Sequence, residues 1–214
     1  MGSVLNGLLL RPKSPKYAGV MASFFSASAF VVAIFLCVYL ISTKTPIHLT
    51  YEWFKTANLS LSFGFYFDAL SAWMVLIITG IGTLIHVYSI GYMAFEPTPS
   101  RYFAYLNLFL FNMLVLVTAD NLLVLFVGWE GVGLCSYLLI GYWYQDIHKA
   151  NAGIKAFVVN RIGDAGFLVG IFICFKLFGT LDFDKLYPKL LSFASTSANP
   201  AMLDPMTLLF WMGV

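Results

Sequence analysis

Two long uncharged runs constrain the fold of this chain more than any other feature. Residues 17–43 and residues 69–95 each contain 27 residues without Asp, Glu, Lys or Arg. A helix crosses a bilayer with about 20 predominantly apolar residues, so each run is long enough for a complete span. The whole sequence is 60% hydrophobic and only 10% charged, against about a quarter charged in soluble domains. The chain is therefore predicted to be an integral membrane protein.

Three further spans complete an all-α, polytopic transmembrane helix bundle. They cover residues 102–119, 121–145 and 156–175, giving about five complete spans with the first two. We expect polar loops at residues 44–68 and 179–204, with a short interfacial helix at residues 182–191. The runs 1–10 and 206–214 are apolar but too short to span, so we expect partial helices there. Residues 1–214 are thus interpreted as a single membrane domain, a fragment of a longer chain.

The short connections at residues 11–16, 96–101 and 145–155 fall on one side of the predicted bundle. Together they hold six Lys or Arg residues, so the positive-inside rule places this side in the cytoplasm or matrix. The net charge of +2 is small and dispersed, which argues against nucleic-acid binding. The three cysteines lie in apolar runs without metal-ligand spacing, so we expect no metal site and no redox centre in this chain.

Glu130 is the only charged residue between residues 121 and 145. With a rise of about 1.5 Å per residue, it lies roughly 14 Å into the span, near the middle of the hydrocarbon layer. An unpaired charge there costs at least about 3 kcal/mol, so such a residue predicts a partner and a proton or ion path. A structural ion pair that fixes the position of the helix is the alternative.

Glycines at 128, 131 and 133 surround this carboxylate. Small residues let membrane helices approach closely, which places Glu130 among protein rather than lipid. The spacing GxxGxG differs from the dinucleotide pattern GxGxxG, and it lies within a span, so no cofactor-binding residues are expected.

Two other charged residues and one histidine lie within predicted spans. Arg161 and Asp164 are three residues apart, so they share a helix face and can pair. They are interpreted either as a pair that modulates Glu130 or as a self-neutralising structural pair. His86 is either a hydrogen-bonded interior histidine or a proton relay. Asp68 precedes a span and is predicted to cap its helix.

Several motifs resemble one family of membrane proteins. The run GWEGVGLCSYLLIG at residues 128–141 resembles the signature of the largest antiporter-like membrane subunit of respiratory complex I. This is the L-type chain of bacteria and the subunit 5 type of mitochondria. Similar stretches are FDALS, SRYFAYLNLF, ADNLL and KAFVVNRIGD, at residues 67–71, 100–109, 119–123 and 155–164. The resemblance covers almost the whole chain from about residue 64, and the run LRPKSPK at residues 10–16 fits the family's connection after its first helix.

This resemblance implies a proton-translocating subunit of NADH:quinone oxidoreductase. In the family, the carboxylate that matches Glu130 pairs with a lysine of the seventh helix, a helix that residues 1–214 do not reach. Arg161 and Asp164 match the family's charged pair on the following helix. The resemblance also implies that NADH, FMN, iron–sulfur clusters and quinone are bound by partner subunits and that this chain holds no cofactor. Its expected partners are other membrane and peripheral subunits, especially a neighbouring antiporter-like subunit, and the lipid bilayer.

Two other functions stay open at this point. A large subunit of a multisubunit sodium/proton antiporter shares the implied fold and a similar glutamate helix, and a structural scaffold subunit would pump nothing. The resemblance favours the bacterial inner membrane, with the mitochondrial inner membrane as the alternative.

Overall fold

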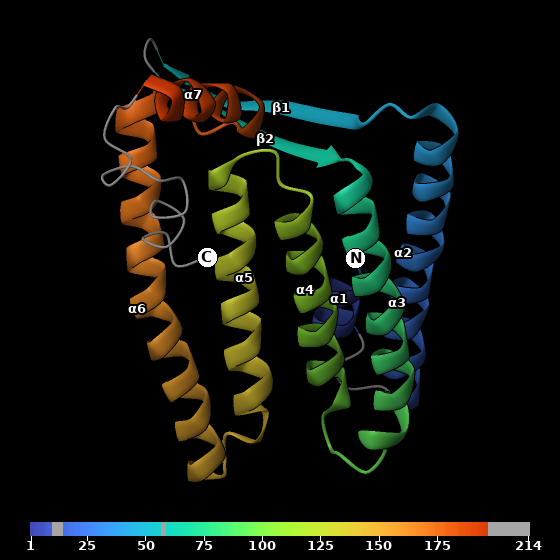
Figure 1. The fold of residues 1–214 in the computed structure, drawn as a ribbon. Coiled ribbons are helices and arrows are strands. Elements are labelled where there is room, and N and C mark those ends of the chain that lie inside the picture. The colour runs from blue at the N-terminus through green and yellow to red at the C-terminus, as the bar shows by residue number, and fades with distance from the viewer. Residues whose placement is uncertain (10–14, 57–58, 197–214) are drawn as a thin grey trace.

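Five long helices stand side by side and alternate in direction in the computed structural model, which describes residues 1–9, 15–56 and 59–196 (Figure 1). Each is long and apolar enough to cross a membrane. The predicted all-α transmembrane bundle is confirmed, and the helix ends lie within a few residues of the predicted ones except in the last span. The helices are α2 (Pro15–Thr43), α3 (Ala69–Tyr92), α4 (Pro99–Val117), α5 (Leu122–Ile140) and α6 (Ile147–Phe178).

Short polar side chains begin several of these helices. The Asp68 carboxylate accepts a hydrogen bond from the Ser71 amide at 2.8 Å, so it caps α3 as predicted. Asn121 caps α5 in the same way, with its side-chain oxygen accepting from the Val124 amide at 2.9 Å. These bonds satisfy amides that the first helical turn leaves without a backbone partner.

Helix α6 is longer than the predicted span 156–175. Asp146 caps it, and its 32 residues correspond to about 48 Å, well beyond a hydrocarbon layer of about 30 Å. The prediction treated Lys149 and Lys155 as lying outside the helix. A helix can continue past the bilayer surface, and cationic side chains are compatible with that exposed part.

The predicted loop at residues 44–68 is wrong for most of its length, because it forms a β-hairpin. Strands β1 (Ile47–Thr56) and β2 (Leu59–Phe67) pair antiparallel, with Ile47 opposite Phe67. The hairpin lies across one end of the helices (Figure 1). The alternation LSLSFGFYF places an apolar residue at every second position of β2, which is the period of a strand with one covered face.

The turn between α4 and α5 is hydrogen-bonded to the hairpin. The Tyr66 amide donates to the Thr118 carbonyl at 2.7 Å, and the Asp120 amide donates to the Gly64 carbonyl at 3.3 Å. A Cβ atom at Gly64 would overlap the Asp120 carboxylate, so this close approach requires glycine. His48 of β1 also contacts that carboxylate, at 3.0 Å.

Helical segments also lie at the two ends of the chain. The expected partial helix at residues 1–10 consists of α1 (Gly2–Val4) and a π-helical turn, η1 (Leu5–Leu9), which pack mainly on α4. Within the expected loop 179–204, residues Phe183–Thr196 form helix α7, which lies at the same end as the hairpin (Figure 1). The expected partial helix at 206–214 lies outside the described residues.

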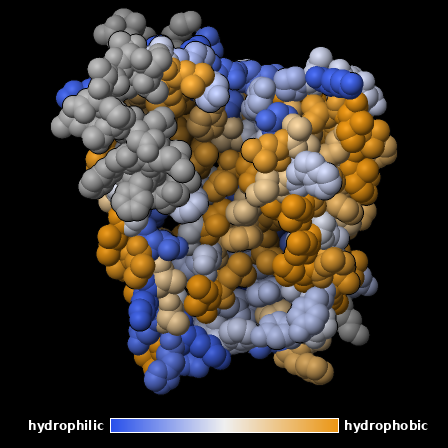
Figure 2. Space-filling model, viewed as in Figure 1, coloured by the Kyte–Doolittle hydropathy of each residue, from blue (hydrophilic) through white to orange (hydrophobic). Residues whose placement is uncertain are grey.

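The connections fall on two sides of the bundle, as the sequence predicted. The α3–α4 and α5–α6 connections lie at one end, and the hairpin, the α4–α5 turn and α7 lie at the other (Figure 1). Figure 2 shows many hydrophobic side chains across the middle of one face and many of the most hydrophilic ones towards its ends. This distribution suits a bundle surrounded by lipid.

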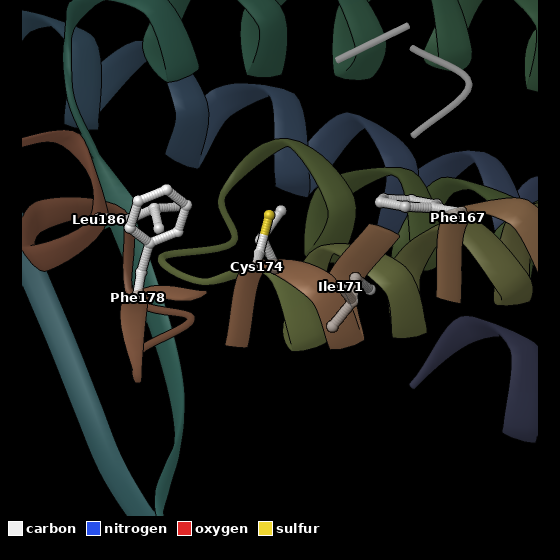
Figure 3. Packing of buried hydrophobic residues seen from close by; sticks show 6 residues of the cluster. Phe167, Ile171, Cys174, Phe178 and Leu186 are labelled. Carbon is white, nitrogen blue, oxygen red and sulfur yellow. The ribbon is translucent and has the colours of Figure 1, made fainter. Parts of the chain in front are cut away.

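A buried apolar cluster joins α5, α6 and α7. Its members, most of which Figure 3 labels, extend along α6 from Phe167 to Phe178, and Leu186 of α7 lies beside Phe178: Leu122, Phe167, Ile171, Cys174, Phe178 and Leu186. The other two cysteines, Cys37 and Cys135, are buried as well.

Candidate charged site between α5 and α6

Glu130 lies midway along α5, and its side chain is 22% exposed. The sequence predicted a partner for it without identifying one. In the structure the Arg161 guanidinium of α6 donates a hydrogen bond to the Glu130 carboxylate and forms an ion pair with it. The two spans are thus joined by charge within the bundle.

Asp164 is the third charged member of this site. Its side chain is 10% exposed, and the second guanidinium contact of Arg161 reaches it at 3.9 Å. The predicted pairing of Arg161 with Asp164 is therefore present, but it is longer than a hydrogen bond. One cation lies between two carboxylates, so the three side chains carry a formal charge of −1 when all are ionised.

Trp129 fixes the position of Asp164. Its indole N–H donates to the Asp164 carboxylate at 2.8 Å, across from α5 to α6. The Trp129 ring also meets the edge of Phe167 at a centroid distance of 6.2 Å. An indole N–H within a membrane span requires an acceptor, so the charged residues of the neighbouring span were candidates for this bond.

Arg161 is held less tightly than the two carboxylates. Its side chain is 49% exposed, and its guanidinium lies 4.8 Å from the centroid of the Phe157 ring. A cation over an aromatic face is stabilised without a fixed hydrogen-bond direction. Arg161 therefore has freedom to turn between its two acceptors.

Two of the three glycines around Glu130 allow α5 to approach α4. A Cβ atom at Gly128 would lie 2.7 Å from the Cα atom of Leu116, and one at Gly131 would overlap the Asn112 side chain. Gly133 faces open space instead. Asn112, which the sequence did not single out, donates to the Cys135 sulfur at 3.4 Å. The glycines thus fix the face of α5 that packs on α4, while Glu130 reaches α6.

The remaining candidate, His86, is not part of this site. It lies on α3 with 1% of its surface exposed, and its Nδ1 atom is 2.7 Å from the Gly82 carbonyl oxygen. Helix α3 packs against α2 and α4, whereas α5 packs against α4 and α6. The structure therefore brings Glu130, Arg161 and Asp164 together and places His86 in a different part of the bundle.

An aromatic cluster closes the ends of α4 and α5 at the side of the short connections. The Arg101 guanidinium donates to the Tyr142 carbonyl at 3.0 Å and lies 4.8 Å from the centroid of the Tyr142 ring. The Tyr142 hydroxyl donates to the Thr98 carbonyl at 2.9 Å. Burial raises the pKa of Tyr142 above its ordinary value of 10.0, because the phenolate loses hydration there.

Metal ligation has no support in the described part of the chain. No group of three or more His, Cys, Asp or Glu side chains there is arranged to hold a metal ion. The described charges at α5 and α6 instead form a mixed set of one cation and two anions, which suits proton or ion transfer between side chains.

Two family models match this chain. Residues 53–103 match the N-terminal model of NADH-ubiquinone oxidoreductase (complex I) chain 5, and residues 119–214 match the transmembrane model of NADH:quinone oxidoreductase/Mrp antiporter proteins. The second match contains Glu130, Arg161 and Asp164.

Curated relatives carry the same names. The chain is 49% identical over 163 residues to NADH-quinone oxidoreductase subunit L of Mycobacterium tuberculosis, covering 76% of this chain and 25% of the relative. It is 44% identical over 161 residues to NADH-ubiquinone oxidoreductase chain 5 of Chondrus crispus, covering 75% and 24%. The chain thus spans about a quarter of the length of these relatives.

Solved structures share the fold. A chain of the Mrp complex from Dietzia superimposes with a TM-score of 0.73 at 21% identity, covering 98% of this chain and 22% of that chain. A chain of the archaeal membrane-bound sulfane sulfur reductase gives a TM-score of 0.72 at 22% identity, covering 94% and 38%.

Proposed function

Since the chain belongs to the antiporter-like membrane subunit family of complex I chain 5 and subunit L, we propose that it carries protons in an energy-converting NADH:quinone oxidoreductase. In this proposal the chain is part of a larger subunit, beside a neighbouring antiporter-like subunit. NADH, FMN, the iron–sulfur clusters and quinone are bound elsewhere in the complex, and this chain has no redox site.

The observation that carries the proposal is the position of Arg161 between two carboxylates. It is hydrogen-bonded to Glu130 and lies 3.9 Å from Asp164. At an effective dielectric constant of 20, two unit charges 4 Å apart interact by about 4 kcal/mol. This energy is large enough for a change in charge on either carboxylate to decide which one the cation contacts.

Protonation of Glu130 supplies such a change. A neutral carboxyl attracts Arg161 less, so the guanidinium turns towards Asp164, the other carboxylate, which Trp129 holds in place. Loss of the proton reverses the movement. Glu130 is thus a proton-loading group, and Arg161 and Asp164 modulate it.

The formal charge of −1 on the three side chains favours a further cation or a proton at the site. The family resemblance implies a lysine of the seventh helix in this role. When that lysine pairs with Glu130, Arg161 is free to pair with Asp164 instead. A proton can then leave the site while every charged side chain keeps a partner.

The test is Glu130→Gln in the full-length subunit, within its complex in sealed vesicles. Proton uptake per NADH oxidised should fall strongly, while the amount of assembled complex stays unchanged. Glu96→Gln is a matched control, because Glu96 accepts from Trp143 at 3.0 Å at the end of the bundle, beside the first turn of α6 and outside the Glu130–Arg161–Asp164 site. Normal pumping by Glu130→Gln would contradict the proposal.

The two alternatives predict different outcomes of the same experiment. A structural scaffold predicts that Glu130→Gln lowers assembly and leaves pumping per complex unchanged. A sodium/proton antiporter predicts exchange of sodium for protons in vesicles without NADH. Its solved representative, at 21% identity, supports the shared fold, whereas 49% identity to subunit L supports the complex I assignment.

A further inference from the structure

A second polar site lies on the other side of α4 from Glu130. Buried side-chain atoms without a protein hydrogen-bond partner are few in the described residues, and most belong to α2, α3 and the N-terminal turn: the amide nitrogen and oxygen of Asn6, the Ser23 hydroxyl and the His86 Nε2 atom. Each of these residues is at least nine-tenths buried. An unsatisfied polar group inside a membrane costs several kcal/mol, so such a concentration requires an explanation.

The pairing of α2 with α3 brings Ser23 and His86 to the same level. Ser26 and Thr83 share a hydrogen bond of 2.8 Å, and a Cβ atom at Gly19 would lie 3.0 Å from the Ile90 side chain. The two helices run in opposite directions. Three residues before Ser26 on α2 and three residues after Thr83 on α3 therefore lie at the same level of the bundle. This register places Ser23 opposite His86.

Helix α4 and the N-terminal turn close the same site. A Cβ atom at Gly82 would lie 3.0 Å from Leu110, which places Asn107, one turn earlier on α4, near the level of His86. The side-chain oxygen of Asn107 lies 2.8 Å from the Cβ position of Gly2. Asn6 follows Gly2 by four residues, about one turn of helix, and is fully buried.

The hydrogen bond to Gly82 determines the tautomer of His86. A carbonyl oxygen can only accept, so the Nδ1 atom, 2.7 Å away, carries the proton. In the neutral ring the Nε2 atom then has a free lone pair, and no described residue forms a hydrogen bond with it. His86 therefore presents a fixed proton acceptor inside the bundle, among neutral polar side chains.

Polar groups continue from His86 towards the end of the bundle with the short connections. Ser89, one turn further on α3, is buried, and its hydroxyl lies 3.5 Å from the Tyr102 hydroxyl. The Tyr102 ring contacts Tyr142 at a centroid distance of 5.6 Å, and the Tyr142 hydroxyl lies 3.3 Å from the Thr98 hydroxyl at the start of α4. Hydroxyl-bearing side chains thus lie between this end of the bundle and the turn of α3 that holds His86, and a ring contact joins Tyr102 to Tyr142.

We propose that His86 and the surrounding Asn6, Ser23 and Asn107 form a second proton-carrying site, filled by internal water and reached through Ser89 and Tyr102. Internal water bonds to two to four otherwise unsatisfied polar groups, which is what these side chains offer. A proton that arrives through the water adds to Nε2 and leaves by the same atom, and Nδ1 keeps its own. The proposal rests on proton transport by this chain, but it uses none of the residues of the Glu130 site.

The test uses the full-length subunit in its complex, reconstituted in vesicles. His86→Gln retains polarity and approximate size but cannot carry a proton at neutral pH. We expect proton uptake per NADH to fall roughly tenfold, a smaller loss than the roughly 10²- to 10⁴-fold effects of general acid–base groups in catalysis. His86→Leu should give the same loss.

Cys37→Ala is the matched control, and it should pump normally. Cys37 is also buried between α2 and α3, but it lies nearer the hairpin, where its thiol donates to the Ala72 carbonyl at 3.6 Å.

Glu130→Gln separates failure of this proposal from failure of the proposed function. Normal pumping by His86→Gln while Glu130→Gln pumps poorly would overturn the second site and leave the proposed function intact. Normal pumping by both variants would overturn both. If both His86 variants failed to assemble while Cys37→Ala assembled, His86 would be a packing residue and the second site would be refuted.

Discussion

The polar side chains on the two sides of α4 differ in how they are accommodated within the membrane. On the α5–α6 side, Glu130, Arg161 and Asp164 carry charge, and each has a partner within the described chain. On the α2–α3 side, His86 and Ser23 are neutral or weakly basic, and their free polar atoms have no protein partner among the described residues. Glu130 and Arg161 are partly exposed, whereas Asp164 on the same side and His86 and Ser23 on the other side are buried.

This difference follows from the cost of each kind of burial. A charge in hydrocarbon costs so much that the fold must supply an opposite charge, and that partner comes from the neighbouring helix. A neutral imidazole or hydroxyl costs less and can be satisfied by water. In the two proposals, proton transfer at the charged side therefore depends on which side chain Arg161 contacts, while transfer at the neutral side depends on hydration.

The largest effect is expected from Gly128→Ala, at the boundary between the two sides. The new methyl group would lie 2.7 Å from backbone atoms of Leu116, which cannot move aside without shifting α4. We expect a loss of about 3 kcal/mol in stability, measured as the melting temperature and yield of the purified complex.

Gly19→Ala is the matched change on the α2–α3 side. There the nearest atoms belong to the side chains of Ile90 and Phe103, at 3.0 Å, and a shift of a few tenths of an ångström by these side chains would make room without moving a backbone. Its cost should stay below about 1 kcal/mol. Equal losses for both variants would show that the two sides pack with the same tolerance.

Arg161→Gln should have the next largest effect. Two carboxylates would remain without their cation, so we expect proton translocation to fall about tenfold. Arg161→Gln combined with Asp164→Asn removes one of those negative charges and should recover part of the activity. A double variant that is no better than the single one would exclude electrostatic coupling through Asp164.

Trp129→Phe tests the support of Asp164. Loss of the 2.8 Å indole bond should cost about 1 kcal/mol and lower proton translocation by roughly two- to fivefold. Trp143→Phe removes an equivalent bond to Glu96 at 3.0 Å, outside the charged site. It should leave translocation unchanged while having a similar effect on thermal stability.

The smallest effect concerns the pH dependence of stability at Tyr142. Burial raises the pKa of the Tyr142 hydroxyl above 10.0. Near this pH the folded protein therefore keeps the Tyr142 proton, whereas the unfolded chain begins to lose it. The contribution of Tyr142 to the free energy of unfolding therefore has its full value below about pH 10. It decreases as the pH rises through the pKa of Tyr142 in the folded protein. Tyr142→Phe should show a smaller decrease in melting temperature between about pH 9 and 11. An identical decrease in both proteins would exclude Tyr142 as its source.

The helices were predictable because the cost of exposing a backbone in lipid makes long uncharged runs helical. The hairpin was missed because its residues are polar enough to be taken for a loop. The alternation LSLSFGFYF was nevertheless visible and is typical of a strand. The length of α6 was underestimated because Lys149 and Lys155 mark the membrane surface, where a helix need not end.

The site residues were predictable only in part. The isolated charge of Glu130 indicated a partner, and the spacing of Arg161 and Asp164 indicated their shared face. The sequence could not show that Arg161 turns to α5 or that Trp129 supports Asp164, because these contacts depend on how two helices pack. The site around His86 depends on three helices and the N-terminal turn, so no local pattern predicts it.

The hairpin has a mechanical consequence for the helices below it. The Asp120–Asn121 turn is bonded to β2 through Gly64 and Ser62 and to the start of α7 through Phe183. This end of α4 and α5 is therefore clamped, and a relative tilt of the helices must pivot there. The opposite ends of the two helices would move farthest, because they are farthest from this hydrogen-bonded turn. Such a tilt would separate Tyr142 from Thr98 more than it would separate Glu130 from Arg161.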